Sequence, residues 1–170
     1  GDRVAMLAEN CYHWLVADHG TLSSGAVTVP LHAPLLPNQV RYQLDNCGAI
    51  GIFVSNEEQA QKINDIRSDL PGLQFLISFE PVPEIDSLRT IIWNDLLQSG
   101  TQSQQLNSVT TLEVDVTQDS LATIIYTSGT TGNPKGVMLT HGNLLSNAVS
   151  TSESSDFRDD DVLLSWLPYS

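Results

Sequence analysis

The stretch from Tyr126 to Gly136, which reads YTSGTTGNPKG, holds the side chains best suited to bind a polyphosphate. Its four hydroxyl donors, which also tolerate a nearby metal ion, are Thr127, Ser128, Thr130 and Thr131. Its three glycines, which let backbone N–H groups converge on an anion, are Gly129, Gly132 and Gly136. Lys135 adds a mobile positive charge, the form in which lysine usually meets phosphate. The chemistry that this stretch predicts is the holding of phosphate groups.

The same composition is also typical of a surface hairpin, because turns are built from these residue types. The stretch does not match the P-loop pattern GxxxxGK[ST], since Pro134 precedes Lys135 and Gly136 follows it. Tyr126 could either line a pocket or pack against the core. Composition alone therefore leaves both interpretations open.

Two short apolar runs flank the loop and predict the strands that position it. Leu121 to Tyr126 is rich in β-branched residues, and Val137 to Leu139 follows the turn made by the Asn-Pro pair. Beyond them, Thr140 is predicted to cap a helix from His141 to about Ser152 with its apolar residues inward, namely Leu144, Leu145 and Ala148. An acidic turn to Asp161 and a last strand, Val162 to Leu167, complete this part.

The chain before the loop alternates between predicted strands and helices. The strands are Arg3–Ala8, Val27–Leu31, Ala49–Val54 and Phe75–Phe79. The first helix runs from an Asn10 cap to about Gly25, and its apolar face holds Cys11, Trp14, Leu15 and Leu22. The second helix runs from Pro37 and ends at Gly48. The third begins at a Ser55–Glu58 capping box and runs to about Leu70. This order predicts an α/β fold, a largely parallel sheet flanked by helices.

Two segments have no single prediction. Leu88 to Trp93 is either a short strand or the beginning of a helix that ends near Gln98. Residues 101–119 are polar and lack a stable period, so they are predicted to form a connector.

Acidic residues outnumber basic ones by 20 to 7, a net charge of −13. This balance argues against a nucleic-acid partner and against a basic membrane-binding surface. There is no apolar run long enough for a transmembrane segment and no signal peptide, which favours a cytoplasmic protein; peripheral membrane association is left open. Cys11 and Cys47 are predicted to be buried, reduced thiols.

The remaining candidate residues favour structural roles. His13, His19 and His32 have no carboxylate or cysteine partner at useful spacing, and His141 is expected to bond locally at the beginning of its helix. Three consecutive carboxylates from Asp159 to Asp161 indicate a solvated turn, because neighbouring carboxylates rarely point at one ion. No metal ligand is predicted within the chain.

The order of residues in the loop resembles the phosphate-binding signature of the adenylate-forming (AMP-binding) superfamily, [ST]-[ST]-G-[ST]-T-G-x-P-K-G. Thr127 to Gly136 agrees with that pattern at all ten positions. Three further segments resemble the family: Trp14–Pro30, Asp45–Ser55 and His141–Asn147. The ending SWLPYS, Ser165 to Ser170, resembles the long-chain fatty acyl-CoA synthetase branch, in which a histidine normally follows.

The resemblance implies an incomplete N-terminal part of the adenylate-forming fold over residues 1–170, with its phosphate loop at 127–136. It implies ATP, Mg²⁺ and coenzyme A, and activation of a carboxylic acid, expected to be a fatty acid, as acyl-AMP. The implied nucleotide-binding residues are Thr127, Ser128, Gly129, Thr130, Thr131, Gly132, Lys135 and Gly136. The catalytic and magnesium-binding residues of the family are expected beyond Ser170, so the 170 residues alone are expected to be inactive.

Two alternatives stay open at this point. The chain could belong to a non-catalytic, truncated relative that only binds nucleotide or serves as an interaction unit. Within the enzymes, the acyl group could pass to a carrier protein instead of coenzyme A, because recognition of the acceptor would lie downstream.

Overall fold

The computed structural model describes residues 1–102, 116–128, 132–155, 158, 160–162 and 169. Its centre is a seven-stranded sheet in the order β5-β4-β3-β1-β2-β6-β7. The strands are β1 (Arg3–Leu7), β2 (Val27–Leu31), β3 (Gly51–Val54), β4 (Phe75–Ser78), β5 (Arg89–Ile92), β6 (Leu121–Thr127) and β7 (Lys135–Thr140). All neighbouring pairs are parallel except β6 and β7, which form an antiparallel hairpin. The predicted α/β fold with a largely parallel sheet is confirmed.

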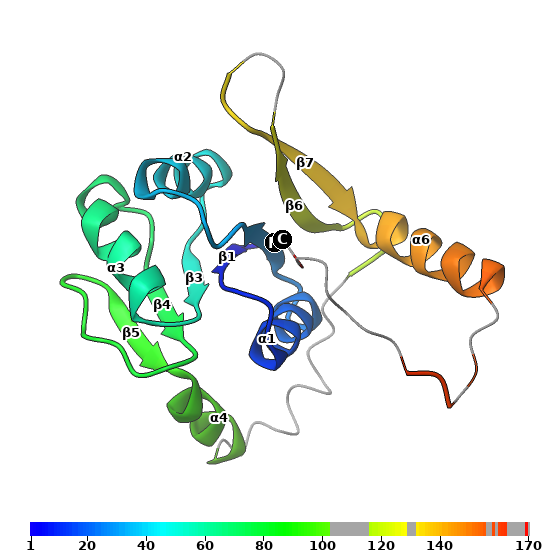
Figure 1. Cartoon of the computed structure of the whole chain (residues 1–170), viewed down its shortest axis with the longest axis horizontal. Helices are drawn as coiled ribbons and strands as arrows, with labels where there is room; N and C mark the ends of the chain where they lie inside the picture. Colours follow the sequence, from blue (N-terminus) through cyan, green and yellow to red (C-terminus); the bar gives the residue numbers. More distant parts are fainter. Residues whose placement is uncertain (103–115, 129–131, 156–157, 159, 163–168, 170) are drawn as a thin grey trace.

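Helices flank this sheet on both faces (Figure 1). They are α1 (Tyr12–Ser23), α2 (Pro37–Cys47), α3 (Glu57–Ile66), α4 (Trp93–Gln102) and α6 (His141–Ser154), with a 3₁₀ turn η1 (Arg67–Asp69) after α3. Side chains of α2 and α3 pack on one face of the sheet, and side chains of α1 and α4 pack on the other.

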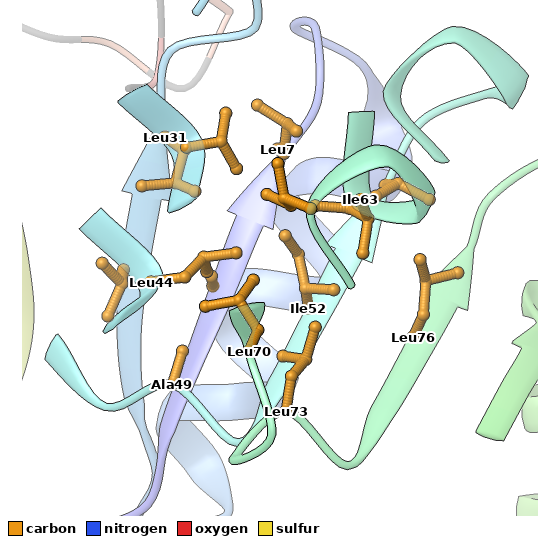
Figure 2. Close-up of a cluster of buried hydrophobic side chains, with 14 of the residues drawn as sticks. Leu7, Leu31, Leu44, Ala49, Ile52, Ile63, Leu70, Leu73 and Leu76 are labelled. Atoms are coloured by element: carbon orange, nitrogen blue, oxygen red, sulfur yellow. The ribbon is translucent and has the colours of Figure 1, made fainter. Parts of the chain in front are cut away.

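The alternation of side chains along β1 explains the two cores. Ala5 and Leu7 point to the α2–α3 side, whereas Val4 and Met6 point to the α1–α4 side. Because both faces are covered, the central strands read as continuous apolar runs. Figure 2 shows the larger core, where Leu44 of α2 and Ile63 of α3 meet the side chains of the central strands.

Two helix ends agree with their sequence signals. α2 ends at Gly48, which has φ 63° and so adopts the left-handed conformation that a C-cap glycine supplies without strain. Thr140 caps α6, because its hydroxyl accepts a hydrogen bond from the N–H of Asn143 at 3.2 Å.

Two predicted N-caps are wrong, because the side chains concerned bind elsewhere. Asn10 does not cap α1: the N-cap is Cys11, and the Asn10 amide oxygen accepts from the N–H of Tyr169. α3 is capped by Asn56, whose side chain accepts from the N–H of Gln59, while Ser55 donates its hydroxyl to Glu9.

The predicted inward face of α1 is right for Trp14 and wrong for Leu15, and the predicted inward face of α6 is wrong. α1 buries Trp14, Ala17 and Thr21, whereas Leu15 is exposed. In α6 no side chain is buried: Leu144 is half-buried, and Leu145 and Ala148 are exposed. The main neighbour of α6 in the described part of the chain is β7, which covers too little of the helix to bury an apolar face (Figure 1).

The segment with two predictions contains both elements: β5 is followed at once by α4. α4 extends to Gln102, two residues into the range predicted as a connector. The predicted connector over 103–115 and all but the first residue of the predicted strand Val162–Leu167 lie outside the described residues. Cys11 and Cys47 are unpaired, as predicted, but are half-buried instead of buried.

Candidate phosphate-binding site

The loop between β6 and β7 begins at the edge of the sheet where ligands commonly bind in α/β proteins. β6 runs parallel to β2, so Thr127 lies at the same edge as the carboxyl ends of β1 and β3. Open parallel sheets bind ligands at this edge. Thr127 lies directly opposite Lys135 in the antiparallel register, which brings a hydroxyl and an ammonium group to the base of the loop.

The predicted site residues that the structure describes leave their polar groups accessible. Thr127, Ser128 and Lys135 are exposed, and Lys135 makes no ion pair with any described residue. Gly129, Thr130 and Thr131 lie outside the described residues. An accessible lysine without a carboxylate partner is what an anionic ligand requires.

Gly132 has φ 128°, a conformation that residues with a Cβ rarely adopt. Among the described residues, no atom lies within 4 Å of the place where its Cβ would be, so the backbone conformation, and not crowding by these residues, favours glycine here. An anion could approach this open backbone closely.

Gly136 has a packing role that sequence reasoning missed. A Cβ at Gly136 would lie 2.8 Å from Ile124 Cγ2 and 3.4 Å from Tyr126 Cζ. Tyr126 is its partner in the hairpin register. Glycine at this position therefore gives room to the Ile124 side chain of β6, whether or not its N–H also meets phosphate.

Helix α2 supports the hairpin through two tyrosine hydroxyls. Tyr126 of β6 donates to Asn46 Oδ1 at 2.7 Å, with the Gln43 carbonyl at 3.2 Å as a weaker alternative acceptor. Tyr42 of α2 donates to the Pro134 carbonyl at 3.2 Å. Tyr126 thus packs against the core and bonds to a helix, which resolves the choice left open for it.

The surroundings of the Tyr126 phenol and the Cys47 thiol keep both groups protonated. Burial raises the pKa of the Tyr126 phenol well above its usual range, and the neighbouring Cys47 and Tyr42 raise it further. Burial also raises the pKa of the Cys47 thiol. Tyr126 therefore acts as a neutral hydrogen-bond donor, and Cys47 lacks the lowered pKa of a nucleophilic thiol.

A second polar cluster lies at the same sheet edge. The Glu9 carboxylate accepts hydrogen bonds from Ser55 Oγ and, at 2.8 Å, from Gln59 Nε2. Lys62 Nζ donates to the Ala33 carbonyl at 2.8 Å and lies 3.6 Å from Glu58. These bonds join the segments after β1, β2 and β3 to α3, which indicates a structural role.

Among the described residues, no group of three His, Cys, Asp or Glu side chains could hold a metal ion. The His13 ring packs against Phe79 and Trp93, with ring centroids 5.4 Å apart in both pairs, and the His19 Nδ1 lies 2.9 Å from the Leu15 carbonyl.

In the part of the chain that the structure describes, no helix has both the length and the apolar character to cross a bilayer.

Comparison with known families identifies this arrangement. The model of the AMP-binding enzyme family matches residues 1–170. The chain belongs to the AMP-binding enzyme family. The family assignment confirms the resemblance that was read from the loop and the segments around it.

Curated members of the AMP-binding family that resemble the chain are fatty acyl-CoA synthetases. A long-chain-fatty-acid–CoA ligase, ACSBG2, from Xenopus laevis is 30% identical over 98% of this chain and 23% of its own length. A peroxisomal long chain acyl-CoA synthetase 7 from Arabidopsis thaliana is 32% identical over 99% of this chain and 24% of its own length. The chain thus spans about a quarter of the length of the curated relatives it matches.

Solved AMP-binding enzymes share the fold. The inhibitor-bound N-terminal domain of FACL13 from Mycobacterium tuberculosis has a TM-score of 0.74 and 29% identity, covering 99% of this chain and 38% of that domain. ATP-bound MatB from Rhodopseudomonas palustris has a TM-score of 0.75 and 28% identity, covering 99% of this chain and 30% of that protein. The present chain corresponds to part of an adenylate-forming N-terminal domain.

Proposed function

We propose that the chain is the N-terminal portion of an ATP-dependent ligase that activates a carboxylic acid as acyl-AMP and transfers it to coenzyme A. One observation supports this above all: in a member of the AMP-binding family, Lys135, which has no ion pair with a described residue, and the exposed Thr127 and Ser128 lie together where the loop between β6 and β7 begins, at the carboxyl edge of the sheet. The proposed ligands of the phosphates also include the three residues that lie outside the described ranges, Gly129, Thr130 and Thr131.

In the proposed first step, a carboxylate oxygen attacks the α-phosphorus of ATP, and the bond to the pyrophosphate oxygen breaks. Negative charge accumulates on the departing β- and γ-phosphates. In this proposal Lys135 and the hydroxyls of Thr127 and Ser128 hold this portion, and the register that sets Thr127 opposite Lys135 supports it. Donors fixed in advance at developing charge lower the barrier. Magnesium is expected to bind the phosphates through residues outside the chain, and no step is assigned to it here.

The proposed substrate is a fatty acid, because the curated relatives above are named as fatty acyl-CoA synthetases. Coenzyme A is proposed as the acceptor on the same ground; transfer to a carrier protein is the alternative among enzymes, and a relative that binds nucleotide without catalysis is the alternative outside them. A cytoplasmic location, with peripheral contact to membranes left open, belongs to the same proposal.

Substitution of Lys135 by alanine in the full-length protein tests the role of the loop. Adenylate formation should slow by about 10²–10³-fold, the scale seen when one preorganised donor is lost, while the KM for the acid changes little. Lys62→Ala is the charge-matched control, since Lys62 is the other lysine of the chain, lies in α3, donates to the Ala33 carbonyl and forms an ion pair with Glu58. Acid-dependent pyrophosphate exchange measures the step, and an unchanged rate in Lys135→Ala would contradict the assigned role.

A further inference from the structure

The loop end of the phosphate hairpin extends past the neighbouring strand β2, which ends at Leu31, level with Tyr126 in the register that sets Thr28 opposite Thr123. β6 pairs with β2 at Thr123, opposite Thr28, and Tyr126 lies three residues farther along the strand. β7 is the edge strand and pairs with β6. The end of the hairpin that contains Lys135 therefore depends on contacts from outside the sheet.

We propose that Tyr42 and Tyr126 are positioning residues that fasten this end of the hairpin to α2 and so hold Lys135 in place for the departing pyrophosphate. The inference rests on the proposed function for the role of Lys135. The attachment of the hairpin to α2 is inferred only from the hydrogen bonds of the Tyr42 and Tyr126 hydroxyls.

The two bonds lie on either side of Lys135. The Tyr42 hydroxyl binds the carbonyl of Pro134, and that carbonyl belongs to the planar peptide group whose nitrogen is that of Lys135. Tyr126 lies opposite Gly136, the residue after Lys135, and its hydroxyl binds Asn46. Both the peptide before Lys135 and the strand facing the residue after it are thus linked to the same helix.

α2 is a firm support for these bonds. Val40 and Leu44 of α2 are buried in the larger core at 0% and 1% exposure, and Gly48 ends the helix in the left-handed conformation (Figure 2). Tyr126 packs against the same core. Because protein cores are close-packed, the helix cannot shift freely to follow a moving hairpin.

The role of Gly136 fits this arrangement. A Cβ at this position would lie 2.8 Å from Ile124 Cγ2, so the close packing of β7 on β6 beside Tyr126 depends on glycine here. A residue of the phosphate-loop signature therefore serves the support of the loop, independently of any contact with phosphate.

Removal of single hydroxyls from the full-length protein tests the proposal. Tyr42→Phe and Tyr126→Phe each keep the ring, and Tyr12→Phe is the matched control because Tyr12 is 76% exposed on α1. Backbone hydrogen exchange over residues 132–140 should become faster in both variants and fastest in the double variant, with exchange in β1 and β3 unchanged. Adenylate formation should slow by about two- to tenfold per hydroxyl, the scale of one hydrogen bond, with the KM for the acid unchanged.

A double-mutant cycle isolates the bond of Tyr126. Asn46→Ala should reproduce the exchange change of Tyr126→Phe, and combining them should add little, because both remove the same bond. Asn46→Asp, which keeps an oxygen acceptor, should restore slow exchange. Exchange over 132–140 that is unchanged in the Tyr42→Phe/Tyr126→Phe protein, or that rises equally in β1 and β3, would overturn the proposal.

The two proposals fail in different ways. Hydrogen exchange is measured without substrate, so it tests the fastening whatever reaction the protein catalyses. Faster exchange in the tyrosine variants together with normal adenylation in Lys135→Ala would contradict the assigned role of Lys135 and leave the fastening intact.

Discussion

Glu9 illustrates how a carboxylate at the carboxyl edge of the sheet can serve structure. Burial would raise its pKa above the usual value of 4.5, but hydrogen bonds from Ser55, from its own backbone and from Gln59, together with the charge of Lys62, outweigh burial and lower it. The charged form is therefore favoured by folding. Its partner Ser55 lies 46 residues away in the sequence, so local spacing gave no indication of this pair.

A lowered pKa makes stability depend on pH in one direction. The unfolded chain takes up the Glu9 proton first, so this contribution is present above about pH 4.5 and is lost as the pH falls through the lowered pKa. Glu9→Gln should therefore lose less stability than the unaltered protein between pH 5 and pH 3, as measured by urea unfolding. Glu84→Gln, at an exposed position without a hydrogen bond or ion pair in the described part of the chain, is the control and should follow the unaltered protein; parallel curves for all three would refute the role of Glu9.

Individual residues also show which features could be predicted from the loop signature and which could not. The sequence of Thr127 to Gly136 was sufficient to predict the family to which the chain belongs. It could not predict Tyr42, because the Tyr42 hydroxyl meets the Pro134 carbonyl across 92 residues. The Ser-x-x-Glu pattern at Ser55 failed for the same reason, since a tertiary partner competed for the capping hydroxyl.

At the scale of elements, β3 and β4 are held together by a close approach at Gly51. In their parallel register Gly51 faces Phe75, whose ring atoms lie 2.1–2.7 Å from the position of a Cβ on Gly51. The ring thus occupies the space over the glycine, and a methyl group there would push it from its place in the α1–α4 core.

Gly51→Ala should destabilise the protein by about 1–3 kcal/mol, the usual cost of overpacking. Gly100→Ala is the control, because Gly100 lies within α4 and no atom of the described residues lies within 4 Å of its Cβ position. That variant should be neutral or more stable, since alanine favours helices. Urea unfolding of both variants measures the difference, and equal midpoints would show that the Phe75 ring can move aside without cost.

The central elements were largely predictable because their signals are local. Gly48 ends α2 by its own backbone preference, and apolar β-branched runs form the buried strands wherever they occur. The buried faces of the helices were harder to predict from the sequence. The inward face of α6 could not be read from Leu145, because burial depends on what packs against the helix and not on the apolar residue itself.

At the scale of the whole molecule, four of the ten large apolar side chains that are exposed among the described residues lie in β7 and α6. Val137 and Met138 of β7 are 42% and 68% exposed, and Leu145 and Val149 of α6 are 52% and 45% exposed. The chain spans about a quarter of the length of its curated relatives.

The 170 residues alone should therefore show no acid-dependent pyrophosphate exchange, whereas the full-length protein should show it. The physical reason is that the loop holds only the leaving-group side of the proposed reaction. Calorimetry of ATP binding to the isolated chain is the control, because binding would show that the loop is formed. Exchange activity in the isolated chain would contradict the proposal.

The two tyrosine bonds have a consequence for transplanting the loop. A peptide of residues 121–140 would contain every residue of the phosphate signature, yet neither Asn46, which accepts from Tyr126, nor Tyr42, which binds Pro134. Such contacts across 80 and 92 residues form only after the chain between them has closed, and that closure costs entropy that a hairpin cannot recover alone. In folding, the loop should therefore be among the last parts to reach its final shape, after α2 has docked. A grafted loop would need a copy of α2 beside it.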